Sequence, residues 1–141
     1  MERDRLLLID DEPEIGSFVG TVAEDCGYQV AVTSAPEAFK SAYASFRPTV
    51  IALDLAVPDT DGIELLQFLA EQGCPAKILI LSGLDRCVLE IAERLGEARG
   101  LSMAGIIPKP APAAELRKLL SGLQAVAYTP SSGDNCPLQG A

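Results

Sequence analysis

The sequence lacks several residue types and patterns, and each absence narrows what the chain can do. Its 141 residues include no histidine and no tryptophan, and aromatic residues make up only 5%. Without histidine, neither a Cys-His nor a Ser-His pair can carry out nucleophilic catalysis. The four cysteines form no C-x-x-C pair. Their wide spacing argues against a zinc site and indicates isolated thiols of a cytosolic protein.

Positive charge and long apolar runs are also scarce. Eleven Lys and Arg residues stand against 20 Asp and Glu, which gives a net charge of −9. Nucleic acids and anionic membranes both require basic surface, so neither is an expected direct partner. No apolar run reaches the length of a membrane span, and the run after "MERDR" is too short for a signal peptide. We therefore expect a cytoplasmic location.

The chain does contain five short apolar runs that alternate with helical patterns. The runs cover residues 6–10, 28–33, 49–54, 77–82 and 103–107. Nearly continuous apolarity predicts strands buried on both faces, as in a parallel sheet, although the second run alternates more and suits an edge. The pattern predicts an α/β fold, a flavodoxin-like (βα)5 doubly wound parallel sheet with strand order 2-1-3-4-5.

Helical spacing of apolar residues predicts the intervening helices. In the fourth helix, Leu84, Val88, Ile91, Ala92 and Leu95 form the stripe that we expect to face the core. From residue 126 onward Pro, Gly and Ser are frequent and no amphipathic period remains. We therefore expect a single domain over residues 1–125, and a flexible tail or linker stub over residues 126–141.

Chemically reactive residues follow the carboxyl ends of four predicted strands. Asp10 and Asp11 follow the first strand, Asp54 ends the third, Ser82 ends the fourth, and Lys109 comes after the fifth. Ligand sites in doubly wound sheets lie at this edge, where the strand order reverses. We expect three carboxylates, a hydroxyl and an ammonium to converge there.

Carboxylates so close together cannot all stay ionised without a cation, and Mg²⁺ suits a few carboxylates together with water and phosphate oxygens. Asp54 is then the candidate nucleophile, which attacks phosphorus to form an aspartyl phosphate. Lys109 supplies fixed positive charge, and Ser82 donates a hydrogen bond to a phosphoryl oxygen. The backbone N–H groups near Ala56 and Gly83 assist.

Four segments resemble the signatures of two-component response-regulator receiver domains. They are "LLLIDDEPEIG", "IALDLAVPDTDGIELL", "ILSGLD" and "GIIPKP", and the resemblance extends from residue 5 to about 124. By matching position, it implies that Asp54 is the phosphoacceptor, that Ser82 is the hydroxyl switch and that Lys109 is the lysine of the receiver site. It further implies a phosphoryl donor, a sensor histidine kinase or phosphotransfer protein. Phosphorylation would shift the surface formed by the fourth helix, the fifth strand and the fifth helix.

The resemblance also implies a set of metal ligands. Asp11, Asp54 and the backbone carbonyl of Ala56 would bind Mg²⁺ directly, and Asp10 would bind it through water. Such a domain is a signalling module and no enzyme beyond its own phosphoryl transfer and dephosphorylation. One departure concerns the switch, because Ile106 stands where receivers carry Phe or Tyr. A rotating aromatic ring therefore cannot relay the signal.

The segment that begins at "SGLDRCVLEIAERLGEARG" is similar to receivers that precede EAL-type cyclic-di-GMP phosphodiesterase domains. An EAL-type output domain or a homodimer is therefore an expected partner. One alternative is a receiver-like module that acts by dimerisation without phosphorylation. A haloacid-dehalogenase-like phosphatase would need a second Asp where Ala56 stands. A flavodoxin-like FMN module would need a Ser/Thr-rich loop where "DDEPEI" stands.

Overall fold

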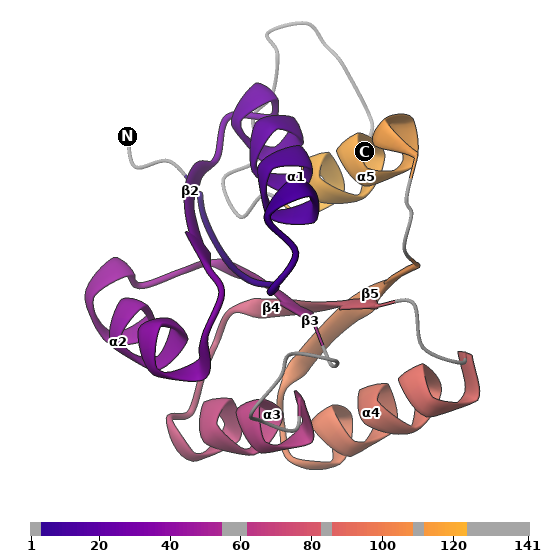
Figure 1. The fold of residues 1–141 in the computed structure, drawn as a ribbon. Helices are drawn as coiled ribbons and strands as arrows, with labels where there is room; N and C mark the ends of the chain where they lie inside the picture. The colour runs from indigo at the N-terminus through magenta and orange to yellow at the C-terminus, as the bar shows by residue number, and fades with distance from the viewer. Residues whose placement is uncertain (1–3, 55–61, 83–85, 109–111, 124–141) are drawn as a thin grey trace, which may run out of the picture.

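The computed structural model describes residues 4–54, 62–82, 86–108 and 112–123 (Figure 1). Within these ranges strands and helices alternate strictly along the chain. The elements are β1 (Arg5–Ile9), α1 (Pro13–Asp25), β2 (Gln29–Thr33), α2 (Pro36–Phe46), β3 (Val50–Asp54), α3 (Gly62–Glu71), β4 (Lys77–Ser82), α4 (Arg86–Ala98), β5 (Ser102–Pro108) and α5 (Ala113–Gly122). None of the helices in this described part is long and apolar enough to cross a bilayer.

The five strands form one parallel sheet in the order β2-β1-β3-β4-β5. This confirms the predicted fold and the edge position of the more alternating strand β2. The sheet register sets Ile9 of β1 beside Leu53 of β3, and Asp54 beside Leu81 of β4. The strand order reverses between β1 and β3, so the ends of these two strands are neighbours at the reversal point.

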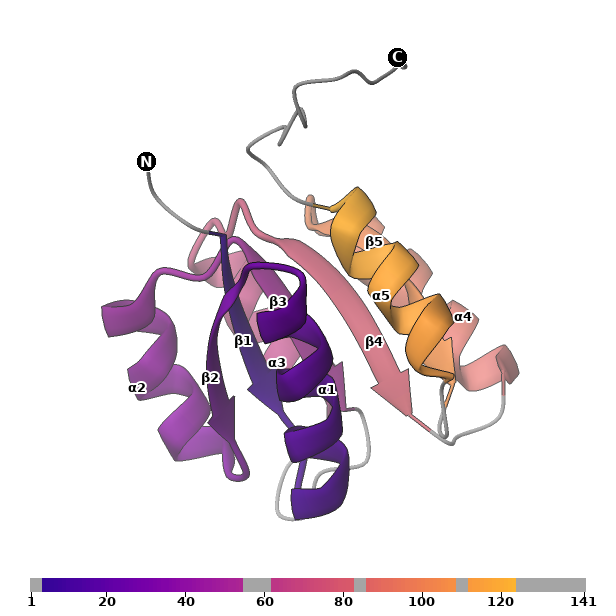
Figure 2. The ribbon, with the colours of Figure 1, turned by 90° about the horizontal axis from the view of Figure 1, so that it is seen from above.

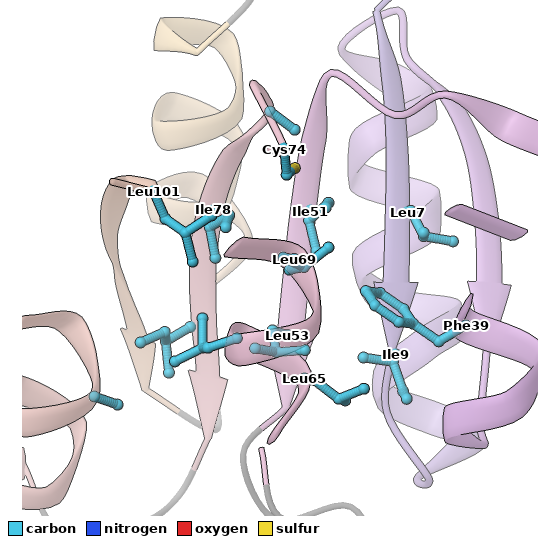
Figure 3. Close-up of a cluster of buried hydrophobic side chains, with 14 of the residues drawn as sticks. Leu7, Ile9, Phe39, Ile51, Leu53, Leu65, Leu69, Cys74, Ile78 and Leu101 are labelled. Atoms are coloured by element: carbon cyan, nitrogen blue, oxygen red, sulfur yellow. The ribbon is translucent and has the colours of Figure 1, made fainter. Parts of the chain in front are cut away.

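Two helical layers cover the sheet. Figure 1 shows α1 and α5 on one face and α2, α3 and α4 on the other, and Figure 2 shows the same arrangement from above. Alternate residues of β1 supply the two cores, because successive side chains of a strand point to opposite faces. Leu7 and Ile9 belong to the cluster under α2, α3 and α4 (Figure 3), whereas Leu6 and Leu8 belong to the cluster under α1 and α5.

Two glycines of helix α1 face the edge strand β2. A Cβ atom added at Gly16 would come within 2.9 Å of Val32 Cγ1, closer than van der Waals contact allows. A Cβ atom added at Gly20 would meet Val30 at 3.5 Å, which is an ordinary contact. Only Gly16 is therefore required by the close approach of helix and strand.

Helix α4 packs on the sheet with a different face from the one that its apolar stripe predicts. Leu89, Ala92 and Gly96 are buried, whereas Ile91 is 64% exposed and Leu95 is half-buried. The prediction that Ile91 faces the core was therefore wrong. The reason is that α4 carries two neighbouring apolar stripes, and periodicity cannot decide which one packs when both are apolar.

Strand β5 contains a bulge that was not predicted from the sequence. Ile78 pairs with Met103 and Leu79 pairs with Gly105, so Ala104 is an extra residue. Gly105 has a φ of +152°, which L side chains rarely adopt. The extra residue lets Met103 and Ile106 both pack against the core on the α4 side, although a spacing of three would otherwise send them to opposite faces.

Candidate functional site

The carboxyl ends of β1 and β3 bring acidic side chains from distant parts of the sequence together. Asp10 follows β1 directly, and its backbone N–H donates to the Thr33 carbonyl at 3.1 Å, which ties it to the end of β2. Asp54 is the last residue of β3, the strand next to β1. The parallel register thus places both residues at one edge of the sheet.

Three carboxylates meet at this edge. Asp10, Asp11 and Asp54 each offer an oxygen atom, and these three atoms lie within 4.8 Å of one another. Asp10 is 2% exposed and Asp54 is 1% exposed, whereas Asp11 is exposed to solvent. The cluster therefore has a buried floor and an open side through which a ligand can approach.

A hydrogen bond to the backbone holds Asp10 in place. The N–H of Glu12 donates to Asp10 Oδ1 at 2.8 Å, the local turn that an aspartate favours two residues before the bonded N–H. Helix α1 then begins at Pro13, a favoured residue for the first helical position. The role of the Glu12 backbone was missed from the sequence, although an aspartate shortly before a helix-starting proline is a usable signal for such a turn.

The charge and ligand chemistry of the cluster fit a divalent metal ion. Three carboxylates at this separation repel one another, and a bound cation would offset that repulsion. Carboxylate oxygens are the protein ligands that Mg²⁺ prefers, and Mg²⁺ also retains several waters, which the open side allows. The chemistry of the three carboxylates at this edge therefore suits Mg²⁺.

The other predicted site residues fall at or beyond the limits of the described chain. The backbone of Ser82 lies at the end of β4, on the strand next to β3, where it pairs with Pro108 of β5. This places Ser82 at the same edge of the sheet as Asp54. Ala56, Gly83 and Lys109 lie outside the described residues, so their roles stay predictions.

Comparison with known proteins agrees with this geometry. The chain is 36% identical over 118 residues to the sensor protein TorS of Escherichia coli, which covers 83% of this chain but 12% of TorS. It is 32% identical over 108 residues to a protein-glutamate methylesterase/protein-glutamine glutaminase of Shewanella oneidensis, which covers 75% of this chain and 30% of that protein. The chain thus spans a third or less of the length of these relatives.

Solved structures extend the comparison. A response regulator from Colwellia psychrerythraea matches with a TM-score of 0.72 and 31% identity, covering 85% of this chain and 95% of that one. The chemotaxis response regulator CheY4 of Vibrio cholerae shares the fold with a TM-score of 0.74 at 22% identity, covering 86% and 99%. The family model for the response regulator receiver domain matches residues 6–121, which includes Asp10, Asp11, Asp54 and Ser82. The chain therefore belongs to the response regulator receiver domain family of two-component systems.

Proposed function

We propose that this receiver accepts one phosphoryl group on Asp54 from the phosphohistidine of a sensor kinase or phosphotransfer protein, in a Mg²⁺-dependent reaction. The observation that carries the proposal is the three-carboxylate cluster, in which Asp54 is buried beside Asp10 and Asp11 at the sheet edge. No other arrangement of Asp and Glu residues in the described part of the chain offers the same combination of buried acceptor and open approach.

The proposed transfer is a substitution at phosphorus. A carboxylate oxygen of Asp54 attacks, the new O–P bond forms, and the P–N bond to the donor imidazole breaks with its electron pair leaving on nitrogen. Asp11, Asp54 and the backbone carbonyl of Ala56 would hold the Mg²⁺ ion directly, and Asp10 would hold it through water. When bound, Mg²⁺ would neutralise charge on the phosphoryl oxygens. Ser82 and Lys109 contribute a hydrogen bond and a positive charge to the phosphorylated form.

The output is proposed to be a shift of the surface formed by α4, β5 and α5. The aspartyl phosphate carries about −1.5 to −2 charges where the Asp54 carboxylate carries a single negative charge, and the added charge and oxygen atoms alter hydrogen bonding at the adjoining strand ends. A groove of about 570 Å³ between β5 and α5 supports this surface as the place where an output domain or partner binds. Ile106 and Leu119 line the groove. A partner of EAL type in the cytoplasm is the specific proposal, with the receiver at residues 1–125 and a flexible tail or linker stub at 126–141.

Intact-mass measurement tests the phosphoacceptor. The protein is incubated with acetyl phosphate and Mg²⁺ and then weighed intact, with the Asp54→Asn variant beside it. We expect the protein with the printed sequence to gain the mass of one phosphoryl group and the Asp54→Asn variant to gain none. Asp25→Asn is the matched control, because Asp25 is an exposed carboxylate on α1 that pairs with Arg117. No added mass, or equal added mass on the Asp54→Asn variant, would refute the proposal.

A further inference from the structure

Helix α4 is seated on the sheet through its smaller apolar stripe. Among the α4 residues whose burial the structure describes, Leu89, Ala92 and Gly96 form the stripe that faces the core, and Gly96 has no side chain. The larger Ile91 is 64% exposed, and Leu95 on the same side of the helix is half-buried. The two stripes are about 100° apart around the helix, the angle that one residue subtends. A rotation of α4 by about this angle would bury the larger stripe, including Ile91, in place of the smaller one.

One close contact between β5 and α4 accompanies the observed packing of the helix. A Cβ atom added at Gly96 would lie 2.4 Å from Met103 Sδ and 3.0 Å from Met103 Cγ. The thioether therefore occupies the space that any other residue at position 96 would fill. Methionine is flexible and fills irregular gaps, so this contact fits closely but can be given up at small cost.

Met103 lies near the amino end of β5, where it pairs with Ile78, so a change at the phosphoacceptor edge has to travel along β5 to reach it. It directly precedes the bulge at Ala104, and together with Ile106 it faces the core on the α4 side. Ile106 pairs with Ile80 of β4, two residues before Ser82. A shift at the end of β4 would reach Ile106 first, through its pairing with Ile80, and would reach Met103 along β5.

We propose that Met103 seated in the notch at Gly96 is a latch that holds α4 in its resting arrangement, and that phosphorylation of Asp54 favours a second arrangement in which the latch is released and Ile91 is buried. The inference rests on the proposed function, because it states how the phosphoryl group at that site is communicated. Because position 106 is an isoleucine, no aromatic ring can relay the signal, and the packing contact between Met103 and Gly96 would take that role. A phosphoryl mimic that favours the second arrangement should bind more tightly when a substitution destabilises the resting arrangement. The dissociation constant of the mimic therefore measures the contribution of the latch.

Beryllofluoride with Mg²⁺, a mimic of the phosphoryl group, is the probe. Its dissociation constant is measured by isothermal titration calorimetry, and the unfolding free energy of each variant is measured in urea. Gly96→Ala blocks the notch and is expected to tighten binding about fivefold or more. Gly20→Ala is the matched control, because a Cβ atom on this buried glycine of α1 meets only ordinary contacts.

The opposite change tests the second arrangement. Ile91→Ser alters a side chain that is 64% exposed at rest, so unfolding free energy should change little. The binding of beryllofluoride should nevertheless weaken about fivefold or more, because the activated arrangement loses a buried isoleucine. Phe18→Ser, at an apolar residue of α1 that is 37% exposed, is the control and should leave the affinity unchanged. The double variant Gly96→Ala/Ile91→Ser should return towards the affinity of the unmodified protein.

The outcomes separate the two proposals. If the unmodified protein does not bind beryllofluoride, or binds it as the Asp54→Asn variant does, the proposed function fails. If the unmodified protein binds but Ile91→Ser and Phe18→Ser have equal affinities, the latch is overturned and the phosphoacceptor stands. If Gly96→Ala does not fold, the Ile91→Ser measurement decides alone. A change in unfolding free energy without a change in affinity would assign Gly96 a structural role only, and would also overturn the inference.

Discussion

Replacing Asp54 with Asn should stabilise the fold when no divalent metal is present. Each pair of carboxylate oxygens in the cluster is separated by at most 4.8 Å. Two full charges 4.8 Å apart repel by about 3.5 kcal/mol at an effective dielectric constant of about 20, and by about 0.9 kcal/mol in bulk water. The higher figure is closer for Asp10 and Asp54, since both are buried, and the lower one for pairs with the exposed Asp11.

The net gain is smaller than the repulsion removed. Asp54 makes at least one further interaction in the folded protein, and Asn would retain only part of any interaction made by the carboxylate. We therefore expect Asp54→Asn to raise the free energy of unfolding by about 1–3 kcal/mol in EDTA. Mg²⁺ at ten times its dissociation constant should add about 1.4 kcal/mol to the unmodified protein and much less to the variant. The difference between the two proteins should therefore narrow as Mg²⁺ is added.

Urea unfolding followed by circular dichroism measures both quantities. Asp25→Asn serves as the control, because the ion pair between Asp25 and Arg117 is exposed and should be worth less than about 1 kcal/mol. The reasoning is refuted if Asp54→Asn is no more stable than the unmodified protein in EDTA. It is also refuted if Mg²⁺ stabilises both proteins equally, since the metal would then bind elsewhere.

Three further predictions test packing, ionisation and chemistry. Gly16→Ala should destabilise the fold by about 1–3 kcal/mol in urea unfolding, because its Cβ would overlap a side chain of β2. The same change at Gly20 should be neutral or stabilising by up to about 1 kcal/mol, and equal effects at both positions would contradict the packing described. Burial and a hydrogen bond to a neighbouring thiol raise the pKa of Tyr43 to about 12. Its contribution to stability is therefore full below the ordinary tyrosine pKa of about 10 and is lost as the pH rises through about 12, which ultraviolet titration and unfolding at alkaline pH will follow. The aspartyl phosphate should be long-lived, because Ala56 and Leu84, two positions past the phosphoacceptor and the switch hydroxyl, offer no side chain to position an attacking water; decay within seconds in Mg²⁺, measured by intact mass, would contradict this.

Much of the fold was readable from the chain because its signals are local and strong. Short apolar runs that alternate with amphipathic segments leave a parallel doubly wound sheet as the packing that buries both. The acidic residues Asp10 and Asp54 stand out because each ends an apolar run. Parallel strands place such ends at one edge of the sheet, so the cluster could be predicted before any distance was known.

Other features depended on competition between packings of similar quality. The packing of α4 could not be predicted, because its two apolar stripes are one residue apart around the helix. The choice between them depends on contacts with other segments, such as that of Met103 with Gly96. The bulge at Ala104 was equally hidden, although Gly105 within an apolar strand is a signal for one.

The amino-acid sequence by itself thus determined the sheet, its order and the acidic edge, since periodicity and strand ends are properties of single segments. Only the tertiary structure decided which face of α4 is buried and where the side chains of β5 point. Both outcomes depend on how side chains from separate segments fit together, and the sequence of one segment carries no information about that fit.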